Sequence, residues 1–279
     1  AEYEAGRPVP VGDWQLREPV TQTITLLSPV GNLIFAAPDI ARVDVPIAAS
    51  VRPLPVTTAA GEESFEVVMA RSRRPLEVNE QYQVVSMQTA ITERALIEAS
   101  TEYPDAIREQ YLQLPENFSE RVAADAAAIT AGAATPFQKA RAIESALRNT
   151  IPYNDNIEAP PPDRDPVEYF LYDIREGYCD YYATAMVVML RSLGIPSRVV
   201  SGYAEGVYDP ETGLFTVTER DAHTWVEVYF PGYGWIEFEP TAGETQLNRP
   251  SGDEEVQTDL LSEQMPQNSE ASPSQDPMM

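Results

Sequence analysis

Three residues in the C-terminal half of the chain have side chains that could together perform nucleophilic catalysis: Cys179, His223 and Glu239. Cys179 is the only cysteine and His223 the only histidine among the 279 residues. A thiol, an imidazole that takes its proton and a carboxylate that orients the imidazole form a general unit for acyl transfer through a thioester. The chemistry therefore depends on whether the fold brings these three side chains into contact.

Cys179 lies at the start of a predicted helix. Gly177 precedes it, apolar residues recur on one face over residues 182–193, and Gly194 followed by Ile195 ends the pattern. Unpaired N–H groups and aligned peptide dipoles at a helix N-terminus stabilise an anion, so the position favours a thiolate. A buried free cysteine is also common as a small hydrophobic residue, so the sulfur needs further context before it indicates catalysis.

His223 and Glu239 lie on two neighbouring predicted strands. The C-terminal third contains four β-favouring runs, at residues 198–203, 214–218, 223–230 and 235–239. The apolar residues of the last two strands lie on the same face of the sheet only in certain registers. In those registers the numbers of two paired residues add up to an even value, as for Trp225 opposite Glu239. A plain four-residue loop gives an odd sum, so we predict a three-residue loop or a bulge within residues 231–234. The same register places Glu239 diagonally beside His223.

An oxyanion formed during acyl transfer needs hydrogen-bond donors that stabilise its charge. The backbone N–H of Cys179, at the start of its helix, is the expected first donor. Tyr153 and Tyr178 are candidates for the second donor, and the sequence does not choose between them. His223, taken singly, fits a structural histidine as well as a general base.

The remaining segments divide the chain into three predicted parts. Residues 1–102 carry short β-favouring runs and are predicted to form a small antiparallel β-domain. Residues 103–247 are predicted to form the catalytic core. Residues 248–279, rich in acidic residues, Pro and Ser, are predicted to be a disordered linker because they cannot bury enough apolar surface. The runs expected as strands in the first part are residues 23–27, 33–35, 64–69 and 82–87.

Two further helices and one loop are predicted ahead of Cys179. Ser119 is the expected N-cap of a helix ending at Gly132, and Thr135 forms a capping box with Gln138 at the start of the next. The Pro-rich stretch 154–166 is predicted to be a surface loop. Its carboxylates lack the ligand spacing of a known calcium loop, so solvation is favoured over metal binding.

Composition excludes several classes of function. The formal net charge is −25 and the pI is about 4.2, which disfavours binding to nucleic acid. One cysteine cannot form an internal disulfide, and one histidine cannot build a His-rich zinc site, so we predict no cofactor and no metal. No apolar run reaches the roughly 18 residues of a membrane span, and no signal peptide is visible. The sequence is therefore interpreted as a mature fragment or an excised loop.

Four blocks of this sequence resemble the transglutaminase-like superfamily. They are residues 177–183 (GYCDYYA), 193–198 (LGIPSR), 222–229 (AHTWVEVY) and 234–241 (GWIEFEPT). The resemblance spans roughly residues 118–242 and implies a papain-like α+β fold, in which the nucleophile helix packs on an antiparallel sheet. By position, Cys179 corresponds to the nucleophile and His223 to the general base. Glu239 stands where the family usually has Asp.

The resemblance implies acyl transfer on an amide, by crosslinking a glutamine side chain to an amine or by hydrolysing a peptide or amide bond. Two other hypotheses remain: a non-catalytic binding or scaffold module that keeps the cleft, and a calcium-gated cleft as in some animal relatives.

The expected partners are protein or peptide substrates, with cell-wall peptides among the candidates; the sequence does not predict an oligomeric state. The flanking segments are similar to extracytoplasmic loops of bacterial membrane proteins, which implies an extracytoplasmic location and membrane tethering through parts outside this chain.

Overall fold

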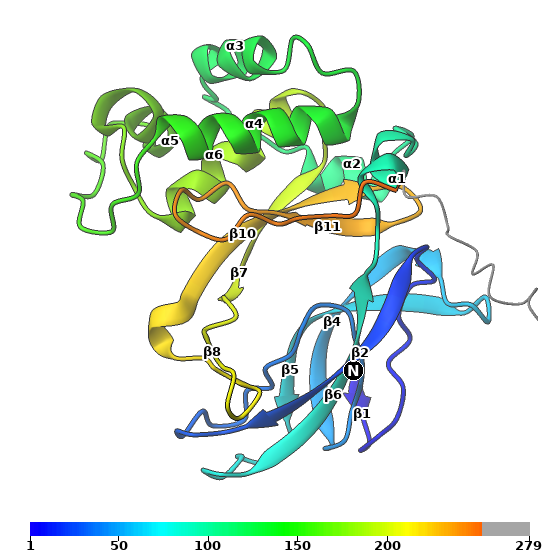
Figure 1. The fold of residues 1–279 in the computed structure, drawn as a ribbon. Coiled ribbons are helices and arrows are strands. Elements are labelled where there is room, and N and C mark those ends of the chain that lie inside the picture. Colours follow the sequence, from blue (N-terminus) through cyan, green and yellow to red (C-terminus); the bar gives the residue numbers. More distant parts are fainter. Residues whose placement is uncertain (253–279) are drawn as a thin grey trace, which may run out of the picture.

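A computed structural model describes residues 1–252 of the chain, which form a β-rich N-terminal unit and a helical unit built on a second group of strands (Figure 1). The predicted acidic linker, residues 248–279, lies mostly outside the described residues. Within residues 1–252, no helix is both long and apolar enough to cross a bilayer. The mixed fold class and the antiparallel sheets expected from the sequence are confirmed.

The N-terminal unit consists of two antiparallel three-stranded sheets, ordered β1-β4-β5 and β2-β6-β3. Their strands are β1 (Glu2–Tyr3), β2 (Arg17–Thr25), β3 (Ile40–Val43), β4 (Ile47–Thr57), β5 (Glu63–Ser72) and β6 (Gln81–Thr89). The two sheets enclose one apolar cluster that includes Ile47, Tyr82 and Val84.

The sequence located β2, β5 and β6 but missed three strands, of which β1 has only two residues. β4 contains Pro53 and Pro55, which normally argue against a strand; its pairing with β5 shifts register at these prolines. β3 has only four residues, too few for a period-2 pattern to stand out. The strand expected at residues 33–35 is wrong: the segment makes only an isolated bridge, from Leu33 to Arg71.

The second unit contains the helices and the sheet that carries the candidate site. The helices are α1 (Glu93–Ile97), α2 (Asp105–Tyr111), α3 (Glu120–Ile129), α4 (Pro136–Thr150), α5 (Pro166–Glu168) with a π-helical turn at Tyr169–Ile174, and α6 (Cys179–Ser192). The antiparallel sheet β11-β10-β7 is formed by β7 (Ser197–Tyr203), β10 (Ala222–Phe230) and β11 (Gly234–Phe238). α4 and α6 cover one face of this sheet (Figure 1).

A separate two-stranded hairpin lies between β7 and β10 in the chain. It is made of β8 (Val207–Asp209) and β9 (Leu214–Thr216), and a 3-10 turn at Glu219–Asp221 leads from it into β10. The run predicted at residues 214–218 is therefore a short strand, but it pairs outside the central sheet.

The helix ends follow the predicted capping chemistry closely. The Ser119 hydroxyl accepts from the N–H of Val122, and Thr135 and Gln138 form the expected capping box. α3 ends at Ile129, earlier than predicted; Thr130 is its C-cap, and both its N–H and its hydroxyl donate to the carbonyl of Ala126. Gly194, with φ of +74°, ends the Cys179 helix in a conformation that suits glycine.

The sequence analysis predicts that the second unit begins at residue 103. In the structure, side chains ahead of this residue already pack against the second unit. Ile91 and Leu96 are buried in the same apolar cluster as α3, α4 and α6. Two apolar side chains are enough to attach α1 to the helices. The composition of this segment therefore does not indicate which unit it packs against.

The β10–β11 hairpin has the register that the sequence predicts. Val228 pairs with Ile236 and Phe230 with Gly234, so each pair has an even sum and three residues form the loop. The N–H of Tyr233 donates to the carbonyl of Phe230 at 3.0 Å, and Gly232 and Gly234 have φ of +86° and +80°. Val226, Val228, Ile236 and Phe238 consequently lie together in the core beneath α6.

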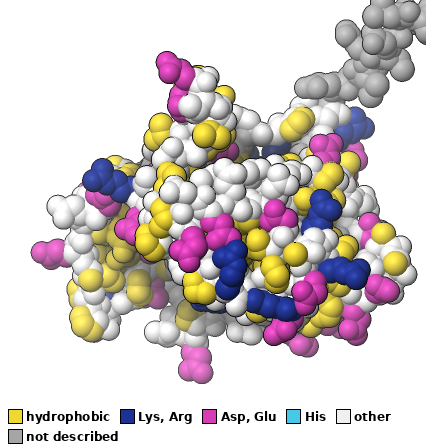
Figure 2. All heavy atoms as spheres, turned by 90° about the horizontal axis from the view of Figure 1, so that it is seen from below, with side chains coloured by type: hydrophobic (Ala, Val, Ile, Leu, Met, Phe, Trp, Pro, Cys, Tyr) yellow, Lys and Arg dark blue, Asp and Glu magenta, His cyan; other side chains and the backbone are white. Residues whose placement is uncertain are grey.

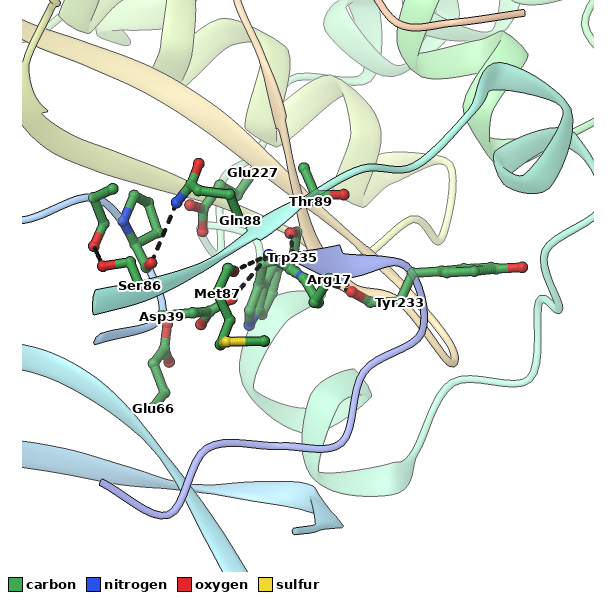
Figure 3. A network of polar contacts seen from close by, with 12 residues as sticks. Arg17, Asp39, Glu66, Ser86, Met87, Gln88, Thr89, Glu227, Tyr233 and Trp235 are labelled. Atoms are coloured by element: carbon green, nitrogen blue, oxygen red, sulfur yellow. Dashed lines mark hydrogen bonds and ion pairs between the residues drawn. The ribbon is translucent and has the colours of Figure 1, made fainter. Parts of the chain in front are cut away.

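Buried ion pairs and aromatic rings join the two units. Arg17 on β2 forms an ion pair with Asp39 and donates to the carbonyls of Tyr233 and Trp235 in the β11 hairpin (Figure 3). Arg198 on β7 lies between the carboxylates of Glu66 and Glu227. Trp14, Tyr111, Tyr229 and Trp235 pack edge to face in a third apolar cluster between them.

Arginine side chains also lie beside Asp and Glu side chains on the outer face of the molecule seen in Figure 2. Ion pairs between exposed side chains elsewhere in the structure include Arg73 with Glu2 and Glu4. Positive charge on the surface is thus neutralised locally, within a chain whose net charge is strongly negative.

Candidate active site

Cys179 is the first residue of α6 and is partly exposed. Its N-cap is Tyr178, which has extended backbone angles and offers no side-chain cap to the first turn. The first N–H groups of the helix therefore have no side-chain cap, which leaves the positive end of the helix dipole beside Cys179. The hydroxyl of Tyr182, one turn along, donates to the carbonyl of Ile151 at 2.6 Å and anchors the helix to the end of α4.

His223 and Glu239 are in direct contact. The imidazole Nε2 lies 2.5 Å from Oε2 of Glu239, and both side chains are about nine-tenths buried. β10 places His223 at its beginning, and Glu239 follows the last residue of β11, so the hairpin register places them diagonally. The longer glutamate side chain reaches the imidazole at this position.

The environment of His223 favours the charged imidazolium. Burial by itself lowers the pKa of His223, but hydrogen bonds and charges of Cys179 and Glu239 outweigh it and raise the pKa to about 10. Cys179 therefore lies close enough to the ring to influence its charge. The structure thus brings His223 and Glu239 into contact, with Cys179 close enough to affect the ring, and this arrangement favours a thiolate–imidazolium pair.

The second oxygen of Glu239 is also occupied. Oε1 accepts the N–H of Thr241 at 2.8 Å, across the intervening Pro240, which has no N–H to compete. The carboxylate is therefore held at both oxygens, one by the backbone and one by His223. Such double anchoring fixes the direction from which the carboxylate meets the imidazole.

Trp225 supports the imidazole from the same strand. Its indole stacks on the His223 ring with centroids 6.3 Å apart and an interplanar angle of 20°. The tip of the indole lies over Gly202, the residue of β7 that pairs with His223. A Cβ at Gly202 would come within 2.7 Å of the indole ring, so only glycine leaves room for this stack.

Replacing Gly202 with alanine is expected to lower the free energy of unfolding by about 1–3 kcal/mol, because the new methyl group overpacks Trp225. Gly132→Ala is the matched control, since a Cβ there meets nothing within 4 Å. Chemical denaturation measures both free energies, and near-UV circular dichroism reports the displaced indole. Equal stability of the two variants would contradict the packing described here.

Tyr153, one of the two candidate oxyanion donors, lies beside the segment that leads into Cys179. It forms a parallel bridge with Gly177, and burial raises the pKa of its phenol, with further contributions from the charges of Asp155, Cys179 and Glu244. Tyr178 instead packs edge-on against Tyr181 at 5.0 Å. Gly177 is also needed for close packing, since a Cβ there would lie 2.9 Å from the ring of Phe170.

The Pro-rich stretch is irregular, as predicted, up to Asp165, whose side chain caps α5. Within residues 1–252, no group of three or more His, Cys, Asp or Glu side chains is arranged to hold a metal ion.

Two residues that contact the site were not identified from the sequence: Glu144 and Arg148, on α4, which bind the backbone of Glu239. Both lie at helical spacing among core residues, and only the fold reveals what they reach.

Comparison with known proteins agrees with this geometry. Residues 123–240 match the family model of the transglutaminase-like superfamily. The chain is 43% identical over 143 residues to an uncharacterised protein, YebA, of Bacillus subtilis, covering 49% of this chain and 19% of that protein. It is 31% identical over 231 residues to a protein-glutamine gamma-glutamyltransferase of Pseudomonas aeruginosa, covering 82% of this chain and 31% of that protein. The chain thus spans less than a third of the length of these relatives.

A solved structure extends the similarity to both units. The periplasmic domain of TgpA from Pseudomonas aeruginosa superimposes with a TM-score of 0.58 and 27% identity, covering 84% of this chain and 75% of that chain. The match therefore includes strands ahead of the region covered by the family model. From the family model, the homologous transglutaminase-like protein and this structure, we conclude that residues 123–240 form a domain of the transglutaminase-like superfamily.

Proposed function

We propose that this chain is a cysteine acyltransferase acting on amides, with Cys179 as nucleophile, His223 as general acid and base, and Glu239 as the orienting carboxylate. The observation that carries the proposal is the contact of His223 with Glu239, together with the influence of Cys179, at the N-terminus of α6, on the same imidazole. No other histidine or cysteine exists in the 279 residues to offer an alternative pair.

In the first half of the reaction, the Cys179 sulfur attacks the carbonyl carbon of the amide. The resulting oxyanion receives hydrogen bonds from the N–H of Cys179, with the Tyr153 phenol as the second candidate donor. The C–N bond then breaks, the leaving nitrogen takes the proton from His223, and a thioester remains on the enzyme. Glu239 stabilises the imidazolium throughout and keeps Nε2 directed at the carboxylate.

In the second half, an amine or water attacks the thioester carbon and gives a proton to His223, which returns it to the departing sulfur. An amine yields a new amide and water yields a carboxylate, so the same residues serve transfer and hydrolysis. The glutamine side chain is the first acyl donor to test, because a relative is named protein-glutamine gamma-glutamyltransferase. Protein or peptide substrates, including cell-wall peptides, remain the proposed partners.

We further propose that the domain works outside the cytoplasm. Its similarity to a domain described as periplasmic supports this location. Since the relatives extend well beyond the matched region, membrane tethering would come from parts outside this chain.

The decisive experiment is to trap the thioester. The protein is incubated with a glutamine-containing peptide and analysed by mass spectrometry, with and without a primary amine. We expect an adduct on Cys179 with the mass of the peptide minus ammonia, and its discharge by the amine. The same adduct should be absent in Cys179→Ala.

Alkylation by iodoacetamide provides a test that needs no substrate. Cys179 is expected to react faster than a free thiol at pH 6, and His223→Ala should remove the advantage. A wild-type rate equal to that of a free thiol, or a rate unaffected by His223→Ala, would overturn the enzyme proposal in favour of a non-catalytic module.

A further inference from the structure

One helix holds both backbone polar groups of Glu239. The N–H of Glu239 donates to Oε1 of Glu144 at 2.9 Å, and its carbonyl accepts from Nη1 of Arg148 at 2.9 Å. Glu144 and Arg148 are four residues apart on α4, so they project from the same helix face. The backbone of the third site residue is therefore fixed from one rigid element.

α4 also forms hydrogen bonds with the backbone that follows Glu239. Arg148 also donates to the carbonyls of Thr241, at 2.8 Å, and Glu244, at 2.6 Å. The Glu144 side chain is 1% exposed, and its second oxygen pairs with Arg141 at 2.6 Å. Arg249, stacked on the ring of Phe238, adds a second positive charge near Glu144.

This support is needed because the β-ladder stops just short of the site. The last residue of β11 paired with β10 is Phe238, so the sheet no longer fixes the backbone of Glu239. Pro240 follows and cannot donate to a neighbouring strand. Hydrogen bonds from α4 fix the backbone of Glu239, where the hydrogen bonds between β10 and β11 have ended.

We propose that Glu144 and Arg148 are positioning residues, which set the place of the Glu239 carboxylate and thereby the charge state of His223. They touch neither the thiol nor a reacting atom and act only through Glu239. The effect on turnover rests on the proposed function, whereas the effect on the imidazole does not.

The readout is the pKa of His223, measured by NMR titration of the full 279-residue chain. As the only histidine, it gives one imidazole signal without assignment ambiguity. Glu144→Leu removes the acceptor of the Glu239 N–H and should let the carboxylate drift from the ring. We expect the proton affinity of His223 to fall at least tenfold, since contact with Glu239 helps to raise the pKa to about 10.

Glu144→Gln is the conservative variant, because its amide oxygen still accepts the Glu239 N–H. We expect it to keep the proton affinity of His223 within about threefold of the wild type. Glu227→Leu is the matched control: Glu227 is also a buried carboxylate paired with an arginine, Arg198, but it makes no hydrogen bond to Glu239. Glu227→Leu should lower the free energy of unfolding but leave the pKa of His223 unchanged.

Arg148→Met is the second test variant, in case Glu144→Leu fails to fold. It should lower the His223 pKa in the same direction by releasing the Glu239 carbonyl. For turnover of the peptide substrate, both variants should reduce kcat far more than they change KM, and the alkaline limb of the pH–kcat profile should move to lower pH.

A His223 pKa unchanged in folded Glu144→Leu or Arg148→Met would overturn the positioning role. A shift of equal size in Glu227→Leu would also overturn it, since the effect would then be general loss of stability. If the wild type shows no thioester while the His223 pKa responds as expected, the proposed function fails and the positioning role stands.

Discussion

Replacing Glu239 with glutamine is expected to lower kcat of the proposed acyl transfer by about 10³–10⁴-fold. The amide retains the size of the side chain but not its charge, so the imidazolium formed during the reaction loses its stabilising partner. Nε2 of His223 now faces an uncharged amide in place of the carboxylate that lies 2.5 Å away in the wild type. Single-turnover measurement of thioester formation isolates this effect from product release.

The same substitution should change how stability depends on pH. The pKa of His223 is about 10 in the folded protein, against an ordinary value near 6.5. A raised pKa means that protonation of His223 stabilises the fold fully below about pH 6.5 and that this contribution is lost as pH rises toward 10. In Glu239→Gln the decline over this window should be shallower, as measured by denaturation at a series of pH values.

Glu239→Asp is the appropriate control, because it keeps the charge and restores the residue usual in the family. It should retain far more activity than the glutamine variant. If the aspartate and glutamine variants were equally impaired, side-chain length and not charge would govern the role of residue 239.

Replacing Arg17 with methionine is expected to lower the free energy of unfolding by about 3–5 kcal/mol, or roughly 6–20 °C in Tm. The Arg17 side chain is 6% exposed and pairs with Asp39 at 2.9 Å. It also donates to the carbonyls of Met87, Tyr233 and Trp235 (Figure 3). Removing it leaves the Asp39 carboxylate, which is only 21% exposed, without its cation, and this costs more than the loss of the pair itself.

Arg73→Met applies the same substitution to an exposed arginine. Arg73 is 37% exposed and pairs with Glu2 and Glu4 on the surface, where solvent screens the charges. We expect a change of less than about 1 kcal/mol. Calorimetry compares both variants with the wild type, and similar Tm values for the two would show that Arg17 does not join the units as described.

Local chemistry made the site predictable from sequence. The Cys179 helix, its glycine stop and the even-sum register of the hairpin all depend on neighbouring residues or on a single strand pairing. Because His223 and Glu239 flank that one hairpin, its register was enough to predict their contact. The three-residue loop followed from the need to keep Val228 and Ile236 on one face.

Long-range contacts were not predictable in the same way. Glu144 lies 95 positions from Glu239, and Arg17 lies 216 positions from Tyr233, so no local pattern links either pair. Glu144 follows Ile143 in an amphipathic helix and looks like a solvent-facing residue until the fold is known. The proline-containing strand β4 was missed for a different reason, since tertiary pairing overrides its unfavourable composition.

The loop that sets the hairpin register is completed by the other unit. Gly234 leaves space for the indole of Trp14, which a Cβ would approach within 3.0 Å, and the carbonyl of Gly232 accepts the N–H of Gln15. The segment bearing Trp14 and Gln15 thus forms one wall of the turn between His223 and Glu239. Exchanging the N-terminal unit for an unrelated sequence would therefore remove this wall from the turn.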